Sequence, residues 1–156
     1  MLVAEVNGCV IGTVSISGHR SRQSESLRMF ALDVGSGFRR RGVGSALIEA
    51  TEEEACRLGL RIVRLEVAVE NHDAIRLYER LGYQRRGDPI EDCWWRLRDD
   101  GSHEEVRELS HVMVKGISSE AHVAQQINVE ITNTNSLPLC RICWRPPARS
   151  QLPLGR

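Results

Sequence analysis

The sequence predicts an α/β (α+β) domain in which a mixed, mostly antiparallel sheet is flanked by helices. Short segments in which apolar and polar residues alternate are interrupted by two longer segments with apolar residues at helical spacing. Turn residues separate the segments, and the resulting order is β-β-β-α-β-α-β-β. A content of 41% hydrophobic and 27% charged residues is typical of a globular protein, and 156 residues are enough for one core.

The first part of the chain is expected to form a β-hairpin. Residues 2–6 and 10–16 read as strands, and Asn7-Gly8 between them is a strong hairpin signal because both residues tolerate positive φ. A hairpin at the start of the chain leaves an exposed strand edge. That edge favours pairing with a second copy, so a homodimer is expected.

Two helices follow the third strand, which is expected over Leu27–Val34. The helices are predicted over Ser45–Leu58 and Asn71–Leu81, since each has apolar residues along one side and a glycine directly after its end. The strand between them, Arg61–Val69, has an apolar face formed by alternate residues from Val63 onward. Further strands are expected over Tyr83–Arg86, Cys93–Leu97 and Ser110–Val114.

Composition divides the chain near residue 116. Residues 1–117 are expected to form the folded domain, and residues 118–156 a disordered tail, because their apolar patches are too small to offset the entropy of ordering. Equal numbers of basic and acidic residues, 21 of each, argue against a nucleic-acid partner. No apolar run is long enough to cross a membrane. Five cysteines without an export signal favour a reduced, cytoplasmic protein.

A glycine- and arginine-rich turn, Gly35–Gly44, joins the third strand to the first helix. Helix N-termini present unpaired N–H groups, glycines allow close approach of the backbone, and arginines add charge suited to phosphates. The turn therefore predicts a pyrophosphate site, with a surface turn of solvated arginines as the alternative. It lacks the lysine of a Walker A loop, and Leu47 replaces the third glycine of the dinucleotide fingerprint. What remains is the pattern R-x-x-G-x-G.

Together with the segment Leu65–Tyr83, this turn resembles the GCN5-related N-acetyltransferase (GNAT) family, and the pattern looks closest to ribosomal-protein alanine acetyltransferases. The resemblance covers about Val3 to Gly116. It implies an acyl-CoA N-acyltransferase-like fold, and direct transfer of the acetyl group of acetyl-CoA to a primary amine: a protein N-terminus, a lysine or a small amine. Because the family usually begins with one strand and two helices before the hairpin, we expect this chain to lack those elements, as an N-terminal truncation.

The resemblance also implies roles for particular residues. Glu66 would act as general base through a water molecule, and Tyr78 would protonate the departing thiolate. Asn71 would contact the cofactor near a splay between the fourth and fifth strands. The third strand would pair with the pantetheine arm through its backbone, and the turn with the start of the helix would hold the pyrophosphate. The residues implied for the pantetheine arm are Leu32, Asp33 and Val34. Those implied for the pyrophosphate are Arg39, Arg40, Arg41, Gly42, Val43, Gly44 and Ser45.

Amine acetylation needs groups of these types. A lysine amine has a pKa of about 10 and must lose a proton before it attacks a thioester, so a nearby carboxylate is useful. A phenol can stabilise a thiolate whose pKa is about 8.5. Two alternatives stay open for the residues: Glu66 as a surface carboxylate, and Tyr78 as a core residue. For the chain, the alternative is a non-catalytic or partner-completed acetyl-CoA-binding fragment. The single CxxC at Cys140 and Cys143 lacks a second ligand pair, so no metal is predicted.

Overall fold

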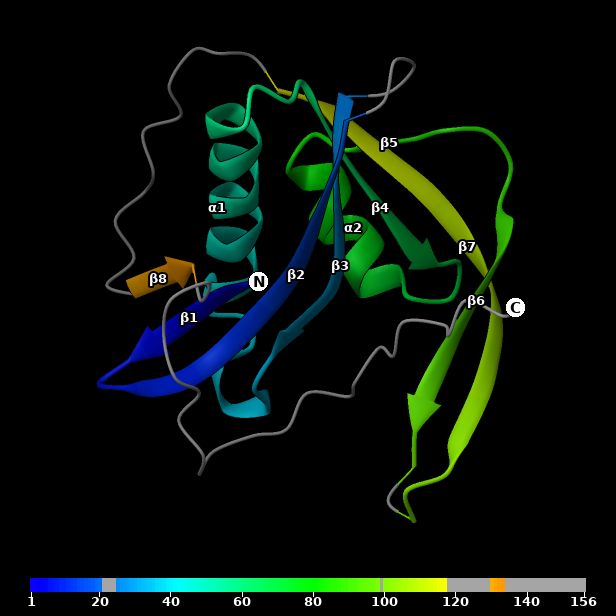
Figure 1. The fold of residues 1–156 in the computed structure, drawn as a ribbon, viewed down its shortest axis with the longest axis horizontal. Helices are drawn as coiled ribbons and strands as arrows, with labels where there is room; N and C mark the ends of the chain where they lie inside the picture. The colour runs from blue at the N-terminus through cyan, green and yellow to red at the C-terminus, as the bar shows by residue number, and fades with distance from the viewer. Residues whose placement is uncertain (21–24, 99, 118–129, 134–156) are drawn as a thin grey trace.

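The computed structural model describes residues 1–20, 25–98, 100–117 and 130–133 (Figure 1). Two helices and eight strands lie within these ranges, together with a short 3-10 helix at Ser36–Phe38. The helices are α1, Val43–Arg57, and α2, His72–Arg80. The strands are β1 Leu2–Val6, β2 Cys9–Arg20, β3 Glu25–Val34, β4 Ile62–Ala68, β5 Gln84–Arg85, β6 Ile90–Leu97, β7 His103–Gly116 and β8 Glu130–Asn133.

The strands form a single mixed sheet in the order β5-β7-β4-β3-β2-β1-β8, and β6 pairs with the other part of β7. Strands β3 and β4 are parallel, and every other pair in the described part of the chain is antiparallel. Since α1 separates β3 from β4, the parallel pair is joined through a helix, as parallel strands require. The predicted mixed, mostly antiparallel sheet flanked by helices is confirmed.

The hairpin turn at Asn7-Gly8 has the predicted geometry, with φ values of 51° and 75°. Several strands extend beyond their predicted limits, and the largest additions are to β2, which continues to Arg20, and to β7, which begins at His103 rather than Ser110. In these added segments most residues are polar, so the sequence shows no alternation of apolar and polar residues that would indicate a strand. In the added part of β7, the ladder with β6 and cross-strand ion pairs hold the ribbon, including Arg98–Glu104 at 3.0 Å.

The hydrophobic core lies between one face of the sheet and the two helices. On β4 the side chains of Val63, Leu65 and Val67 are buried, as their alternation predicts, while Ile62 and Arg64 are exposed. The same cluster contains residues of both helices, so α1 and α2 cover the same face of the sheet. From the helices it includes Val43, Leu47, Ile48, Ala55, Ile75 and Tyr78. The other face of β4 is left for polar side chains.

The outer edge of β1 is paired within the chain. Strand β8 lies antiparallel to β1, with Leu2 opposite Asn133 and Glu5 opposite Glu130. The edge that the sequence leaves exposed is therefore occupied, and the expected homodimer remains a prediction without that edge to support it. The rest of the expected tail, residues 118–129 and 134–156, lies outside the described residues. None of the described helices is long and apolar enough to span a membrane.

Truncation of a core leucine tests this packing. We expect Leu65→Ala to lower the free energy of unfolding by about 2 to 5 kcal/mol, because Leu65 is 1% exposed and its removal leaves a cavity. The matched control is Leu109→Ala on the neighbouring strand. Leu109 is 56% exposed, so its truncation should change stability by no more than about 0.5 kcal/mol. Urea unfolding followed by circular dichroism measures both, and equal losses would contradict the assignment of faces.

Candidate active site

The start of α1 is open to an anion. Gly42 at the N-cap has a φ of 86°, a left-handed conformation that favours glycine. Among the described residues, no side chain caps this end of the helix, and its first turn contains no acidic residue. The first backbone N–H groups of α1 are therefore not taken up by a capping side chain and stand at the positive end of the helix dipole. This arrangement suits the phosphates of a nucleotide cofactor.

The three consecutive arginines of the turn differ in their contacts. The Arg39 Nε donates a hydrogen bond of 2.8 Å to the carbonyl oxygen of Val34, and its guanidinium lies 3.7 Å from the Asp33 carboxylate. Arg39 thus fastens the turn to the end of β3. The Arg41 guanidinium lies over the ring of Phe38, 5.9 Å from its centroid, and Arg40 is exposed with a φ of 60°. All three arginines are exposed, and Arg39 is the one that is tied to the end of β3.

Strands β3 and β4 part in the middle of the sheet. Their parallel ladder runs from Ser26 opposite Ile62 to Met29 opposite Leu65 and then ends, although both strands continue (Figure 1). Past that point β3 pairs with β2 alone, and β4 with β7 alone. The splay therefore falls between the third and fourth strands of the chain, not between the fourth and fifth as expected. Residues 31–34 of β3 therefore lie outside the ladder with β4.

A bulge in β3 accompanies this separation. Thr13 pairs with Asp33, whereas Ser15, two residues further on, pairs with Phe30, so β3 holds one extra residue. Ala31 within it has a φ of 50°. Bulges of this kind redirect backbone groups and are frequent next to active sites. The expected pantetheine contacts, Leu32, Asp33 and Val34, follow the bulge directly.

Asn71 caps α2. Its Oδ1 accepts a hydrogen bond of 3.2 Å from the backbone N–H of Ala74, and Asp73 adds a negative charge in the first turn. The structure thus assigns Asn71 a local role at the helix start. Its expected contact with the cofactor remains a prediction.

Tyr78 lies on the buried side of α2 and is only 7% exposed. Its ring packs edge-on against the ring of Tyr83, with centroids 5.8 Å apart. Burial raises the pKa of Tyr78 to about 12, because a phenolate would be poorly solvated there. Tyr78 is therefore a neutral hydrogen-bond donor at every physiological pH.

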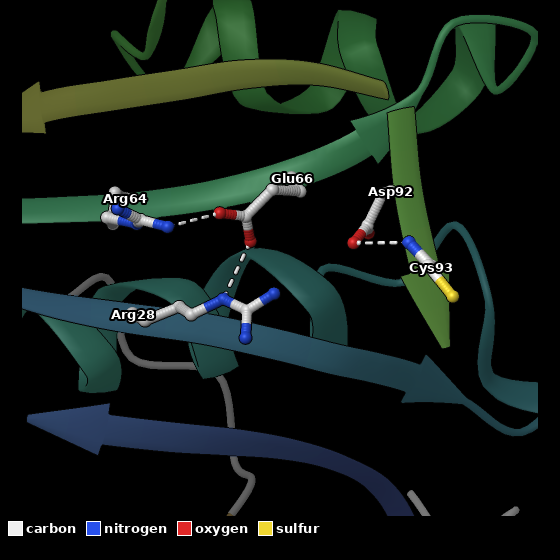
Figure 2. A network of polar contacts seen from close by, with 5 residues as sticks. All are labelled: Arg28, Arg64, Glu66, Asp92 and Cys93. Carbon is white, nitrogen blue, oxygen red and sulfur yellow. Dashed lines mark hydrogen bonds and ion pairs between the residues drawn. The ribbon is translucent and has the colours of Figure 1, made fainter. Parts of the chain in front are cut away.

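Glu66 lies on the other face of β4, between two arginines (Figure 2). One carboxylate oxygen is 2.8 Å from the Arg28 Nε, and the other is 2.7 Å from an Arg64 terminal nitrogen. The Glu66 side chain is only 5% exposed, whereas Arg28 and Arg64 are 37% and 44% exposed. The result is a nearly buried carboxylate held from both sides by guanidinium groups.

The structure brings the expected cofactor residues together but separates the two expected catalytic side chains. The turn, the end of β3 and the start of α1 adjoin, and α2 lies close by: a Cβ added at Gly44 would be 3.7 Å from Leu77 and 3.9 Å from Val34. Glu66 faces away from the helices, whereas Tyr78 packs among them.

Sequence reasoning missed Arg28 and Arg64 as partners of Glu66. Arg64 shares its face of β4 by simple alternation, which is a readable signal. Arg28 comes from β3, and only the register of the parallel ladder places it there. Among the described residues, no three His, Cys, Asp or Glu side chains come together as metal ligands. Cys140 and Cys143 lie outside those residues.

A mixed sheet in which the two strands of the parallel pair separate beside the N-terminus of a helix is the architecture of the acyl-CoA N-acyltransferase fold. Comparison with known proteins agrees: the model of the acetyltransferase (GNAT) family matches residues 1–83. The chain belongs to that family.

Individual relatives agree with this assignment. An uncharacterised N-acetyltransferase of Methanocaldococcus jannaschii is 40% identical over 89 residues, which are 54% of this chain and 38% of that protein. The chain thus matches well under half the length of this curated relative. The crystal structure of Ard1 from Thermoplasma volcanium aligns with a TM-score of 0.56 at 28% identity, covering 74% of this chain and 69% of that one. The ribosomal-protein-S18-alanine N-acetyltransferase of Escherichia coli shares the fold, with a TM-score of 0.54 at 24% identity over 78% and 71% of the chains.

The burial of the two tyrosines predicts how their ionisation and the stability of the fold depend on pH. The chain has two, Tyr78 and Tyr83, and burial raises the pKa of both above the ordinary value of 10. We expect little phenolate absorbance at pH 10, where an exposed tyrosine is half ionised. Because the folded state binds the Tyr78 proton more tightly than the unfolded state, its contribution to stability is complete below pH 10. It should be lost between pH 10 and 12, at a cost of about 2 to 3 kcal/mol.

Spectrophotometric titration and chemical unfolding between pH 8 and pH 12 measure these effects. Half-ionisation of both tyrosines near pH 10 with the fold intact would show that they are exposed.

Proposed function

We propose that this chain is an acetyl-CoA-dependent N-acetyltransferase that passes the acetyl group directly to a primary amine. The observation that carries the proposal is the parting of β3 and β4 directly beside the uncapped N-terminus of α1. One feature exposes extended backbone, and the other offers N–H groups to phosphate. The amine can be a protein N-terminus, a lysine or a small amine.

The cofactor would follow this surface from the turn into the sheet. Backbone N–H groups from Gly42 to Ser45, with the charges of Arg40 and Arg41, suit the pyrophosphate. The edge of β3 at residues 32–34, which lies outside the β3–β4 ladder, suits the amide groups of the pantetheine arm, which can pair with a strand edge as a further strand does. The Val34 carbonyl oxygen on this segment is already held by the Arg39 Nε. Bound acetyl-CoA would thereby supply an activated thioester close to the point where the strands separate.

The acceptor amine must lose a proton, and Glu66 is the proposed base. Its two oxygens accept from Arg28 and Arg64, but an ionised carboxylate has about four lone-pair directions, so each oxygen retains one for a water molecule. Such a water would carry the proton from the amine to Glu66. The two arginines would hold the carboxylate in one orientation during this step.

Tyr78 is proposed to donate a hydrogen bond to the sulfur as the C–S bond breaks. Complete proton transfer from a phenol with a pKa of about 12 to a thiolate with a pKa of about 8.5 is uphill by about 5 kcal/mol. Hydrogen-bond donation is therefore the larger part of the role of Tyr78, and the thiolate can take its proton from solvent later. The neutral amide product forms without a covalent enzyme intermediate.

The alternative is a chain that binds acetyl-CoA but transfers nothing, or does so only with a partner. The observation that favours it is the face of β4 that carries Glu66, which neither described helix covers. Under this alternative, acetyl-CoA binds but no amine is acetylated. For the cell compartment we propose the cytoplasm, since the exposed Cys9 and Cys93 are not joined in a disulfide.

The phosphate site is tested by Gly44→Glu. A carboxylate in the first turn of α1 is favourable for the helix dipole, and an added Cβ would make only ordinary contacts with Leu77 and Val34, so the variant should fold as the wild type does. The same carboxylate would repel the pyrophosphate, and we expect the affinity for acetyl-CoA to fall by at least about tenfold, by charge repulsion in the site. Isothermal titration calorimetry with acetyl-CoA measures it. Gly116→Glu, in open space at the end of β7, is the control with the same charge change. Equal affinity in all three proteins would overturn the placement of the cofactor.

Removal of the Tyr78 hydroxyl tests transfer. We expect Tyr78→Phe to lower kcat by about 10² to 10⁴, the range of a positioned proton donor, with the affinity for acetyl-CoA changed less than about twofold. Thiol release is followed with acetyl-CoA and a panel of acceptors: a peptide with an N-terminal alanine, a lysine peptide with a blocked N-terminus, and spermidine. An unchanged kcat would remove Tyr78 from the mechanism, and binding without transfer to any acceptor would favour the alternative.

A further inference from the structure

A largely buried group of charged and polar side chains adjoins Tyr78 between the sheet and the helices. The Lys115 Nζ donates a hydrogen bond of 2.7 Å to the Glu52 carboxylate, which links β7 to α1. The side chains of Lys115 and Glu52 are 18% and 8% exposed. The same Nζ lies over the ring of Tyr83, 5.7 Å from its centroid. None of these three residues is expected to bind cofactor or acceptor.

Tyr83 connects this group to Tyr78. One side of its ring faces the Lys115 ammonium, and its contact with the Tyr78 ring is edge-on at an angle of 61°. Its backbone N–H also donates a hydrogen bond of 3.0 Å to the carbonyl oxygen of Tyr78, so the end of α2 is tied to it. A displacement of Tyr83 would therefore move Tyr78, and a displacement of Lys115 would act on Tyr78 through Tyr83.

The stability of the fold alone gives no strong reason for this group. A buried ion pair must recover the solvation that both charges lose, and apolar residues of similar volume are often as good or better. In addition, Glu52 Oε1 and the Tyr83 hydroxyl are buried with no hydrogen-bond partner among the described residues. Burial, then the nearby Glu52 charge, raises the pKa of Tyr83, although no hydrogen bond in good geometry joins the two oxygens.

The choice of lysine fits the space. Lys115 is the single lysine among 21 basic residues, the others being arginine. Its stem passes Gly82, where an added Cβ would be 3.7 Å from the lysine Cε. A compact ammonium can pair with Glu52 and lie over the Tyr83 ring at once, whereas a planar guanidinium has different geometric demands.

We propose that Lys115, Glu52 and Tyr83 are positioning residues, which hold the Tyr78 hydroxyl in the orientation needed at the departing sulfur. This inference rests on the proposed function, because it gives the group a role only if Tyr78 acts in transfer. The three residues touch neither acetyl-CoA nor the amine. Their effect is on kcat rather than on cofactor binding.

The test removes both charges together and keeps the volumes. The variant Glu52→Gln/Lys115→Met leaves no unpaired buried charge, so it should unfold at a temperature close to that of the wild type. We expect kcat to fall between about 5-fold and about 100-fold, since small misplacement of a reacting group has effects of that order. The KM for acetyl-CoA should change less than about twofold, because uniform binding is untouched. The acceptor is whichever of the three in the panel gives the highest turnover.

A second comparison separates positioning from a general structural effect. In a Tyr78→Phe background, the same pair of substitutions should lower kcat by less than about twofold, because the group then has no hydroxyl to hold. If the pair variant is too unstable to assay, Tyr83→Leu replaces it, with the same expected results. The exposed pair Arg98–Glu104, whose side chains are 54% and 37% exposed, provides the control, and Arg98→Met/Glu104→Gln should leave kcat unchanged.

The outcomes are distinguishable. A wild type without transfer activity overturns the proposed function and this inference together. A Tyr78→Phe variant with normal kcat removes Tyr78, and with it the reason for the positioning group. If the Tyr78→Phe variant has a lowered kcat but Glu52→Gln/Lys115→Met has a normal kcat, the positioning role alone is overturned. An equal loss in both backgrounds also overturns it, since the group would then act independently of Tyr78.

Discussion

The separation of β3 and β4 is the constraint on which the rest of the structure depends. Neighbouring parallel strands normally pair along their whole length, because unpaired backbone groups inside a sheet are costly. Here the ladder ends at Met29 and Leu65, and a bulge with Ala31 at positive φ turns β3 away. Strand β2 remains paired with β3 on either side of the bulge, and β7 with β4 along its length, so each strand keeps a ladder on its other side. The sheet thus tolerates an interior edge, which a ligand with its own amide groups can complete.

Each element around this opening carries a different part of the proposed site. Gly42 starts α1 without a capping side chain, and Arg39 fastens the turn to Val34, which places the helix N-terminus beside the end of β3. Helix α2 brings Tyr78 to the helix-covered face, whereas β4 carries Glu66 on the other. Access from both faces would let an acceptor amine reach the thioester carbonyl from one side while the thiolate departs towards the other. The proposed chemistry therefore follows from one break in one ladder.

Much of this arrangement is readable from the sequence. The Asn7-Gly8 turn, the alternation of Val63, Leu65 and Val67, and the glycines after both helices gave the elements and their order, because each signal is local. The family resemblance rested on the turn and on Leu65–Tyr83, and the family is confirmed. Strand β2 was predicted too short because its polar end carries no alternation.

What could not be predicted depends on register and on three-dimensional packing. Arg28 reaches Glu66 only through the parallel ladder, 38 residues away in sequence. Lys115 and Glu52 are 63 residues apart, although the position of Glu52 between Ile48 and Ala55 on the buried side of α1 was a readable sign of burial. The pairing of β8 with β1 brings together the two ends of the described chain, and composition alone gave no sign of it.

The most direct measurement of the central claim is amide hydrogen exchange with and without acetyl-CoA. If the cofactor completes the open edge between β3 and β4, exchange should slow in residues 30–34 and in the first turn of α1. The β6–β7 ribbon, which is paired along its length, should exchange at an unchanged rate. Protection of residues 30–34 would support the strand separation as the cofactor site. Unchanged exchange there, under conditions in which calorimetry shows that acetyl-CoA is bound, would contradict it.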